Sequence, residues 1–281
     1  MARTYLLAFP LIIAAAAACF IFAPARAHAQ PGDDPMLPYI HDVLPENIAD
    51  FNMGADGGLI TKEIRRGNPY AKEIALTFDD GPHPFYTAQL LSILRYYRVP
   101  ATFFLVGVQA ERYPKWVQMI HQEGHEIGCH TYDHFRLVNL PLDEQVYQIE
   151  EFTSLIERLT GNKPNLLRPP GGQYDHFTVS LMNKNGMALG LWTINTNDTA
   201  LQIDAGTLYR KTLEEVQPGS IILMHDGSKV SLAALPQLIE TLQRRGYAFV
   251  TMSQMMAHAN SEVLNGSNGH GQTGQWKIIS Y

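Results

Sequence analysis

The sequence predicts an α/β protein in which parallel strands alternate with helices, and it favours a (β/α) barrel over an open doubly wound sheet. Seven short apolar runs lie between residues 74 and 251, separated by helical patterns and loops. Polar residues follow run after run, at Asp79-Asp80, His130, Arg168, Asn195 and His225. The carboxyl ends of barrel strands converge on one mouth, whereas an open sheet spreads them along an edge. This convergence favours the barrel.

The predicted strands are the apolar runs themselves, which in chain order cover residues 74–78, 101–106, 126–129, 165–167, 188–194, 220–224 and 248–251. Two helices have the clearest pattern. Over 143–159 apolar residues recur at spacings of three and four, and Gly161 closes the segment. A second helical pattern, over 232–245, ends at Gly246. Together these elements predict about seven parallel strands with helices between them.

The first 29 residues have the pattern of a secretory signal peptide. Arg3 precedes an apolar stretch over residues 5–22, and Ala27-His28-Ala29 has the small residues of a cleavage site. We expect cleavage after Ala29, and therefore an exported, periplasmic or extracellular protein with no stable membrane insertion after cleavage. The alternatives are an uncleaved anchor, because the apolar stretch reaches the lower limit of a membrane span, and lipid attachment at Cys19.

Composition divides the rest of the chain into three segments. Residues 30–70 are rich in Pro, Gly, Asp and Asn, which predicts an N-terminal tether or irregular cap. Residues 71–257 carry the alternation of strands and helices and are expected to form one folded domain. Residues 258–281 are dominated by Asn, Gly, Ser and Gln, which predicts a flexible C-terminal tail.

Composition and charge also exclude several classes of protein. With 46% hydrophobic and 17% charged residues, the chain is neither disordered nor a small disulfide scaffold. The formal net charge is −6 and no run of Lys or Arg exceeds two, so no nucleic-acid partner is expected. Signal cleavage would leave Cys129 as the single cysteine, which cannot form an internal disulfide. We expect Cys129 to be a small buried hydrophobe at a strand end rather than a reactive thiol.

Two acids and two histidines form the strongest candidate site. Asp79 and Asp80 follow an apolar run, where a turning chain lets both side chains reach the mouth. His130 and His134 lie four residues apart, just past another run. With one carboxylate they supply three protein ligands and leave room for water, as catalytic zinc requires. The same set describes non-haem iron oxygenases, so residue types alone leave the metal open.

Two further positions carry candidate chemistry. Arg168 precedes Pro169-Pro170-Gly171-Gly172, where the prolines stiffen the loop and the glycines let the backbone approach a ligand. His225 closes the run 220–224 and is followed by an acid. A histidine with an acid nearby can be held protonated and serve as a general acid.

Five ordered motifs over residues 72–255 resemble those of the NodB-homology polysaccharide deacetylases, carbohydrate esterase family 4. The segment TFDDGP at 77–82 resembles the first motif and GHEIGCHTYDH at 124–134 the second. Arg168-Pro169-Pro170 resembles the third, 192–198 the fourth and Leu223-Met224-His225 the fifth. The resemblance implies a distorted (β/α) barrel, a NodB-like deacetylase domain over 71–257, and metal-assisted hydrolysis of N- or O-acetyl groups on a glycan substrate.

Carried over position by position, the resemblance implies a ligand set and a base. Asp80, His130 and His134 would bind one divalent metal ion, and zinc is expected. Asp79 would be the general base, held in place by Arg168. An amide carbonyl is a poor electrophile, so the reaction needs a metal to polarise it and to lower the pKa of the attacking water.

The remaining implied roles concern the acid and the substrate. His225 would be the general acid, oriented by Asp198, and Leu223 would line the acetyl pocket. The backbone N–H of Gly171 would help to hold the oxyanion. This chain carries Gly171 and Thr199 where family members usually carry aromatic residues. These two changes remove a wall and a platform of the glycan groove, so we expect a wide mouth.

Two other functions would use some of the same residues. A secreted glycan-binding protein with a degenerate hydrolase site is opposed by the presence of all six central groups, Asp79, Asp80, His130, His134, Arg168 and His225. An iron-dependent oxygenase would be expected on a jelly roll, which the strand–helix alternation opposes. The sequence leaves open the particular glycan and the oligomeric state.

Overall fold

The computed structural model of this chain describes residues 59–264 and 277–279. The expected signal peptide lies outside these residues, as do most of the expected tether and part of the expected tail, so this division of the chain stays a prediction. None of the described helices combines the length and the apolar character needed to cross a membrane.

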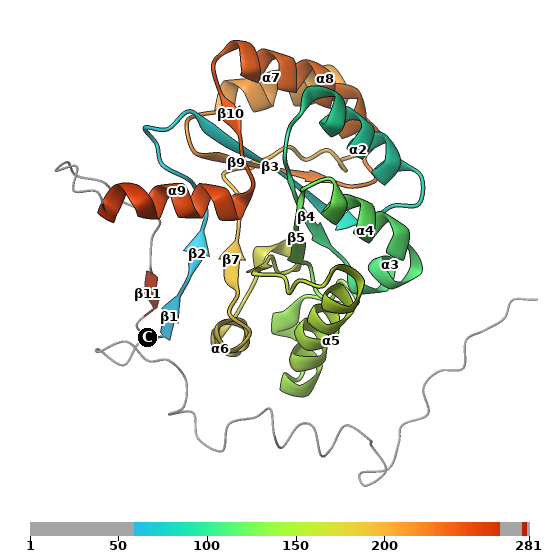
Figure 1. Ribbon diagram of the computed structural model, residues 1–281, viewed down its shortest axis with the longest axis vertical. Coiled ribbons are helices and arrows are strands. Elements are labelled where there is room, and N and C mark those ends of the chain that lie inside the picture. The colour runs from blue at the N-terminus through green and yellow to red at the C-terminus, as the bar shows by residue number, and fades with distance from the viewer. Residues whose placement is uncertain (1–58, 265–276, 280–281) are drawn as a thin grey trace, which may run out of the picture. The chain divides into compact units, whose positions relative to one another are not determined.

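A sheet of parallel strands lies at the centre of the described residues (Figure 1). Its order is β2 (Glu63–Ile64), β7 (Ala188–Gly190), β6 (Leu166–Leu167), β5 (Glu126–Cys129), β4 (Thr102–Leu105), β3 (Glu73–Gly81), β9 (Ser220–His225) and β8 (Ile194–Asn195). A further strand, β10 (Ala248–Phe249), pairs with the start of β3. All these pairs are parallel. Strands β1 (Leu59–Thr61) and β11 (Lys277–Ile279) form a separate antiparallel pair.

Helices surround the sheet in an arc, which Figure 1 shows most clearly for α2, α4, α3 and α5. The α-helices are α2 (Tyr86–Tyr97), α3 (Gly107–Arg112), α4 (Pro114–Gln122), α5 (Leu142–Thr160), α6 (His176–Lys184), α7 (Ala205–Glu215), α8 (Lys229–Arg244) and α9 (Met252–Leu264). Two short 3₁₀ turns, η2 (Leu137–Asn139) and η3 (Pro170–Gly172), lie in loops. The predicted helix at 143–159 is confirmed as α5. It buries one apolar stripe and ends at Gly161, whose φ of 78° is the left-handed conformation that glycine adopts readily.

The two edges of the sheet are joined by the chain between β7 and β8. Leu191 N–H donates to Ile64 O on β2, and Thr193 N–H donates to Ile221 O on β9. The chain therefore leaves one edge of the sheet and continues on the other, which gives the distorted barrel that was predicted. The prediction of one continuous strand over 188–194 is wrong, because the chain changes its partner strand at this crossing.

The apolar core and the polar residues of the barrel mouth lie on the same face of the strands, as the register of β3 and β9 shows. On β3 and β9, Ala75 pairs with Ile221, Thr77 with Leu223 and Asp79 with His225. In-register residues of parallel strands point to the same side of a sheet. Ala75 and Ile221 belong to a buried cluster that also contains Phe104, Leu166 and Met252. The inner face is therefore apolar near the amino ends of the strands and carries Asp79 and His225 at the carboxyl ends.

The Phe104 ring on β4 fills the interior beneath the mouth. A Cβ atom at Gly128 would lie 2.6 Å from this ring, and one at Gly190 would lie 2.7 Å from it. Both contacts are too short for any side chain. Glycine at these two positions on β5 and β7 is what allows the ring to enter the barrel.

Candidate active site

Asp79 and Asp80 both face the mouth because β3 is irregular where it ends. The register between β3 and β4 shifts between Asp79 and Gly81, and Asp80 has a left-handed backbone with φ 71°. Successive side chains of a regular strand point to opposite faces, and the bulge removes this alternation. Both carboxylates consequently lie near one imidazole: His130 Nε2 is 3.7 Å from Asp79 Oδ2 and 3.4 Å from Asp80 Oδ1.

Gly81 completes the bulge and packs against the buried side chain of Asp226. A Cβ atom at Gly81 would lie 2.5 Å from Asp226 Oδ2, so no larger residue fits. The same oxygen accepts a hydrogen bond of 2.6 Å from Thr87 Oγ1 on α2. Burial raises the pKa of Asp226 to about 6. Asp226 thus supports the backbone that presents the two acids, whereas the sequence suggested only an acid next to His225, a role that Asp198 fills.

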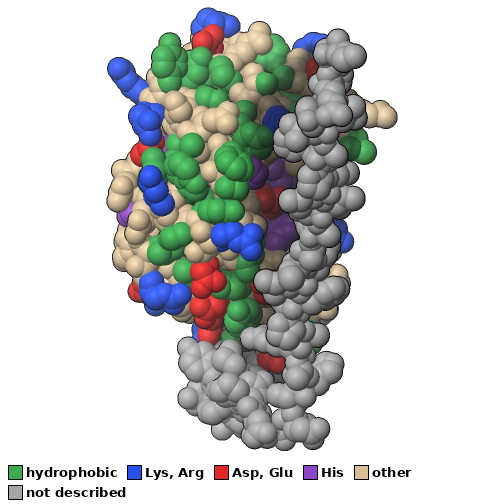
Figure 2. Space-filling view, turned by 90° about the vertical axis from the view of Figure 1, so that its right-hand side faces the viewer, with side chains coloured by type: hydrophobic (Ala, Val, Ile, Leu, Met, Phe, Trp, Pro, Cys, Tyr) green, Lys and Arg blue, Asp and Glu red, His purple; other side chains and the backbone are tan. Residues whose placement is uncertain are grey.

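Asp80, His130 and His134 each bring one ligand atom into a cluster whose atoms lie within 4.8 Å of one another. His134 Nε2 is 3.1 Å from Asp80 Oδ1. This oxygen is buried and forms no hydrogen bond with a described residue, and buried polar atoms in proteins rarely lack a partner. Figure 2 shows histidine side chains and an acidic side chain gathered on one face of the molecule. Within residues 59–264 and 277–279, this is the one group of three side chains with metal-ligand geometry.

The charges of this cluster prepare it for a cation. Burial opposes ionisation of Asp80, yet the close approach and the charge of His130 and His134 outweigh it and hold the pKa of Asp80 well below its ordinary value. The Asp80 carboxylate in turn raises the pKa of His134. Asp80 is therefore an anion at neutral pH. Two nitrogen donors with one anionic oxygen donor are a ligand set that zinc accepts, with positions left for water and substrate.

The tautomer of His130 follows from its second ring nitrogen. His130 Nδ1 lies 2.6 Å from the backbone oxygen of Arg168. A carbonyl oxygen only accepts, so Nδ1 carries the proton and donates it. In the neutral ring Nε2 then presents its lone pair to Asp79 and Asp80, as a metal-ligating histidine does.

Arg168 is completely buried, and its guanidinium nitrogens donate hydrogen bonds to acceptors inside the barrel. Its Nη1 donates to Asp79 Oδ1 at 2.7 Å and to Thr77 Oγ1 at 2.8 Å. Its Nε donates to Gly190 O at 2.7 Å, and its guanidinium lies 3.9 Å from the centroid of the Phe104 ring. A buried charge is tolerated when it is paired and hydrogen-bonded in this way. Arg168 therefore fixes one oxygen of Asp79 and leaves Oδ2 directed toward His130.

His225 and Asp198 form a second acid–base pair at the same mouth. His225 Nδ1 lies 2.7 Å from Asp198 Oδ1, and the backbone N–H of His225 donates to Asp198 Oδ2 at 2.9 Å. Ser231 Oγ also donates to Asp198 Oδ2. Burial opposes ionisation of Asp198, but the bonds from His225 and Ser231 outweigh it and lower the pKa of Asp198. Burial lowers the pKa of His225, but Asp198 outweighs burial, so that this pKa is raised.

The other candidate residues lie at different distances from this centre. Leu223 is buried and faces the barrel interior two residues before His225. Gly171 is exposed in the turn that follows Arg168, with φ 70°. Asn195 does not join the site, because its side chain accepts from the backbone N–H of Asn197 in a local turn. Trp192 is partly buried against the core, as expected of a residue in an apolar run.

Two further supporting residues, Thr77 and Ser231, were not predicted, and one prediction about packing is confirmed. Thr77 lies two residues before Asp79, and the two-residue period of a strand could have placed it beneath that acid. Ser231 has no such signal, because it reaches Asp198 from the first turn of α8. Cys129, the last residue of β5, is buried and forms no disulfide, as predicted. Burial raises the pKa of its thiol to about 12, which disfavours the reactive thiolate.

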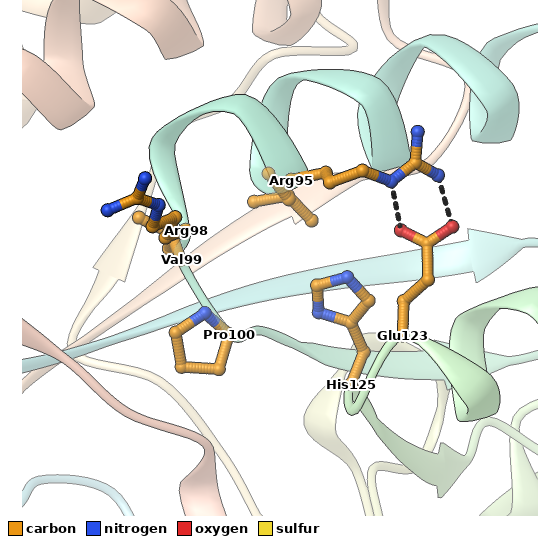
Figure 3. Close-up of a pocket in the computed structure, with 7 residues that line it drawn as sticks. Arg95, Arg98, Val99, Pro100, Glu123 and His125 are labelled. Atoms are coloured by element: carbon orange, nitrogen blue, oxygen red, sulfur yellow. Dashed lines mark hydrogen bonds and ion pairs between the residues drawn. The ribbon is translucent and has the colours of Figure 1, made fainter.

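A separate hollow of about 500 Å³ lies at the amino ends of the strands (Figure 3). It is lined by Leu94, Arg95, Arg98, Val99, Pro100, Glu123 and His125. Its principal charges neutralise each other, since Arg95 binds Glu123 through two nitrogens. The hollow adjoins the starts of β4 and β5, whereas all the candidate catalytic groups lie beyond the other ends of the strands. It is therefore not part of the candidate site.

Comparison with known proteins gives the family of this chain. The family model for polysaccharide deacetylases matches residues 66–190. A peptidoglycan N-acetylglucosamine deacetylase of Bacillus cereus is 38% identical over 192 residues, which are 66% of this chain and 70% of that protein. The peptidoglycan N-acetylmuramic acid deacetylase PdaC of Bacillus subtilis is 35% identical over 188 residues, which are 67% of this chain but 39% of PdaC. This chain thus spans less than half the length of PdaC.

Solved structures agree with this relation. The peptidoglycan N-acetylglucosamine deacetylase Bc1960 superimposes with a TM-score of 0.66 at 35% identity, covering 68% of this chain and 91% of its own. BA3943, a CE4 family pseudoenzyme from Bacillus anthracis, superimposes with a TM-score of 0.65 at 28% identity, covering 69% and 68%. The fold thus occurs both in a named deacetylase and in a pseudoenzyme. By its fold, its five ordered motifs and these relatives, the chain belongs to the polysaccharide deacetylase family of the NodB-homology type, carbohydrate esterase family 4.

Proposed function

We propose that this chain is a metal-dependent hydrolase that removes acetyl groups from an N-acetylated polysaccharide outside the cytoplasm. One observation carries the proposal: Asp79, fixed by Arg168, lies beside the Asp80, His130 and His134 cluster. The names of the relatives PdaC and Bc1960 favour peptidoglycan as the glycan. The signal-peptide pattern of residues 1–29 supports the location.

Asp80, His130 and His134 would hold one divalent cation, and their donor atoms favour zinc. The buried oxygen of Asp80, which has no hydrogen-bond partner among the described residues, fits a cation ligand. When bound, the cation would polarise the acetyl carbonyl and lower the pKa of the attacking water.

Asp79 would accept the proton of the attacking water. Arg168 occupies Oδ1 of Asp79, so Oδ2 is the oxygen available for this proton. The fixed guanidinium also keeps the carboxylate in one orientation during the reaction. A carboxylate suffices as the base because the attacking water is already acidified.

His225 would give a proton to the departing amine. An amine leaves as a neutral molecule only when its nitrogen is protonated, and Nε2 of His225 is the ring nitrogen that Asp198 leaves available. Asp198 raises the pKa of His225, which favours the charged ring that an acid catalyst needs. Leu223 would contact the acetyl methyl group, and the N–H of Gly171 would donate to the developing oxyanion.

The direct test is acetate release from N-acetylated peptidoglycan, a chito-oligosaccharide and an O-acetylated xylan. We expect release from an N-acetylated glycan that stops after exhaustive demetallation and returns when zinc is added. Asp80→Asn should abolish release, with Asp143→Asn on the surface helix α5 as the matched control. Glycan binding without any acetate release, at full metal occupancy, would instead support a binding protein. N-terminal sequencing of the exported protein tests the location, and a mature start at Gln30 is expected.

A further inference from the structure

We propose that Arg136 binds a carboxylate that the glycan carries next to its acetamido group, and so selects an acidic N-acetylated sugar. This inference rests on the proposed deacetylase function and names the sugar on which that function acts. Arg136 lies two residues after His134 and directly precedes the turn η2.

The side chain of Arg136 lies next to Gly171. A Cβ atom at Gly171 would lie 3.5 Å from Nε of Arg136 and 3.8 Å from its Cζ and Nη2. The guanidinium therefore lies beside Gly171, on the side where a side chain at that position would begin and where family members usually carry an aromatic residue. The expected wide mouth is thus partly filled, and it is filled by a positive charge rather than by a ring.

The charge of Arg136 is not neutralised by the described part of the chain. Its side chain is exposed, and it forms no hydrogen bond or ion pair with any described residue. The net charge of the chain is −6, and the mouth near Arg136 contains the acids Asp79, Asp80 and Asp198. By contrast, Arg95 is paired with Glu123. A planar guanidinium without a partner matches the two oxygens of a carboxylate, which it binds through two parallel hydrogen bonds.

The place of Gly171 in the proposed reaction decides where this carboxylate must be. If the N–H of Gly171 donates to the oxyanion formed from the acetyl group, Arg136 lies within a few ångströms of the acetamido group of the bound sugar. In N-acetylmuramic acid the lactyl ether is attached to C3, directly beside the C2 that carries the acetamido group. Its carboxylate is therefore close enough to reach Arg136. The carboxylate of a uronic acid, on the opposite side of the ring, is not.

The experiment compares oligosaccharides of equal length. One contains N-acetylmuramic acid with a free lactyl carboxylate, a second has this carboxylate amidated, a third contains only N-acetylglucosamine, and a fourth carries a uronic acid. We expect the free carboxylate to give the highest kcat/KM. Arg136→Gln should lower that value roughly 10- to 100-fold, as the loss of a hydrogen bond between charged groups does, and should lower the values for the two neutral substrates less than about threefold.

Two matched variants separate position from charge. Arg98→Gln removes an exposed arginine at the other end of the strands, and it should change none of the four values. Arg136→Lys keeps the charge without the planar fork and should retain part of the preference. Added salt should raise KM for the free carboxylate more in the wild type than in Arg136→Gln, because exposed charges are screened.

Each result decides the proposal. Equal losses on all substrates in Arg136→Gln, or a preference for the uronic acid, would overturn the assignment of Arg136 while leaving deacetylation intact. Absence of acetate from every substrate, with metal bound, would overturn the proposed function and this inference with it. Acetate release from the neutral and acidic sugars at equal rates in the wild type would overturn this inference alone.

Discussion

The two ends of strand β5 carry two buried histidines whose Nδ1 atoms have opposite hydrogen-bonding roles. His125 precedes the strand, and its Nδ1 accepts a hydrogen bond of 3.2 Å from the backbone N–H of Ala101. His130 follows the strand, and its Nδ1 donates to the backbone oxygen of Arg168. Burial lowers the pKa of His125 to about 4, with nearby Arg95 adding to the effect and Glu123 opposing it.

The difference shows that the backbone partner of a histidine selects its role. An N–H group at Nδ1 of His125 places the ring proton on Nε2 and holds the ring neutral as a structural element. A carbonyl at Nδ1 of His130 frees the lone pair of Nε2 for a ligand. Both residues lie in the same sequence motif, five positions apart, and both are next to acids and an arginine. Residue type and burial alone do not distinguish them.

Removing each imidazole should produce the largest contrast. His130→Gln should lose the bound metal and reduce acetate release to the level of the demetallated protein, because one of three protein ligands is gone. His125→Gln should keep full metal occupancy, since its amide oxygen still accepts from Ala101. Elemental analysis and acetate release on both variants provide the measurement. Equal metal loss in the two variants would remove the distinction between the two ends of the strand.

The adjacent acids at the mouth should separate in the same way. Asp80→Asn should lose metal affinity, because a neutral amide replaces an anionic ligand. Asp79→Asn should keep the metal and lower kcat by roughly 10²- to 10⁴-fold, the usual contribution of a general base. Metal stoichiometry and kcat are measured on both proteins. The roles assigned to the two acids are wrong if Asp79→Asn loses the metal as Asp80→Asn does.

The pH dependence of the rate should reflect the protonation of His225. Its pKa is raised above the ordinary value for histidine by Asp198, which outweighs burial, and activity should fall as pH rises through that raised pKa. Asp198→Asn removes the carboxylate that raises this pKa, so the fall should move to lower pH, and kcat should drop roughly 10- to 10²-fold, a part of the usual general-acid contribution. Profiles of kcat against pH for both proteins are the measurement. An alkaline limb at the same pH in both would contradict the pairing.

The smallest effect concerns stability at the amino end of β5. The pKa of His125 is lowered to about 4 in the folded chain, while an unfolded chain takes up the proton near the ordinary value of about 6.5. The unfolded state therefore binds more protons between these values, and the free energy of unfolding falls as pH decreases from about 6.5 to 4. His125→Gln should flatten this fall by on the order of 2 kcal/mol. Urea unfolding at pH 4.5 and pH 7.5 measures it, and parallel changes in both proteins would count against a neutral buried ring.

Strand positions and the barrel were predictable because apolar runs and the polar residues after them follow a simple period. Six of the seven predicted strands are present as single strands, with ends that differ from the predicted ones by at most three residues. His130 and Arg168 continue the inward-facing period of Gly128 and Leu166, so the same two-residue rule directs them into the mouth. The residues that belong to a regular strand are thus the ones whose orientation the sequence can predict.

Features that depend on irregular backbone or on distant contacts were not predictable in this way. The run 188–194 gives no sign of the crossing between sheet edges, because its residues are apolar on both sides of it. Strand β2 lies in a segment whose Pro, Gly and Asn content indicates a tether. The approach of Arg136 to Gly171 joins two loops that are 35 positions apart in the sequence, and no periodicity relates them. Asn195 has the right type and position for the site but is used in its own turn.

The bulge at Asp80 has a consequence for protein engineering. A designer who copies Asp79-Asp80 onto an ideal parallel strand would send one carboxylate into the barrel and the other into the helical layer, however well the remaining ligands were placed. What must be transplanted is a backbone: a left-handed residue between two strand residues, with Gly81 after it and a buried acid against that glycine. The Asp79-Asp80 pair can be transferred to another protein only together with this bulge.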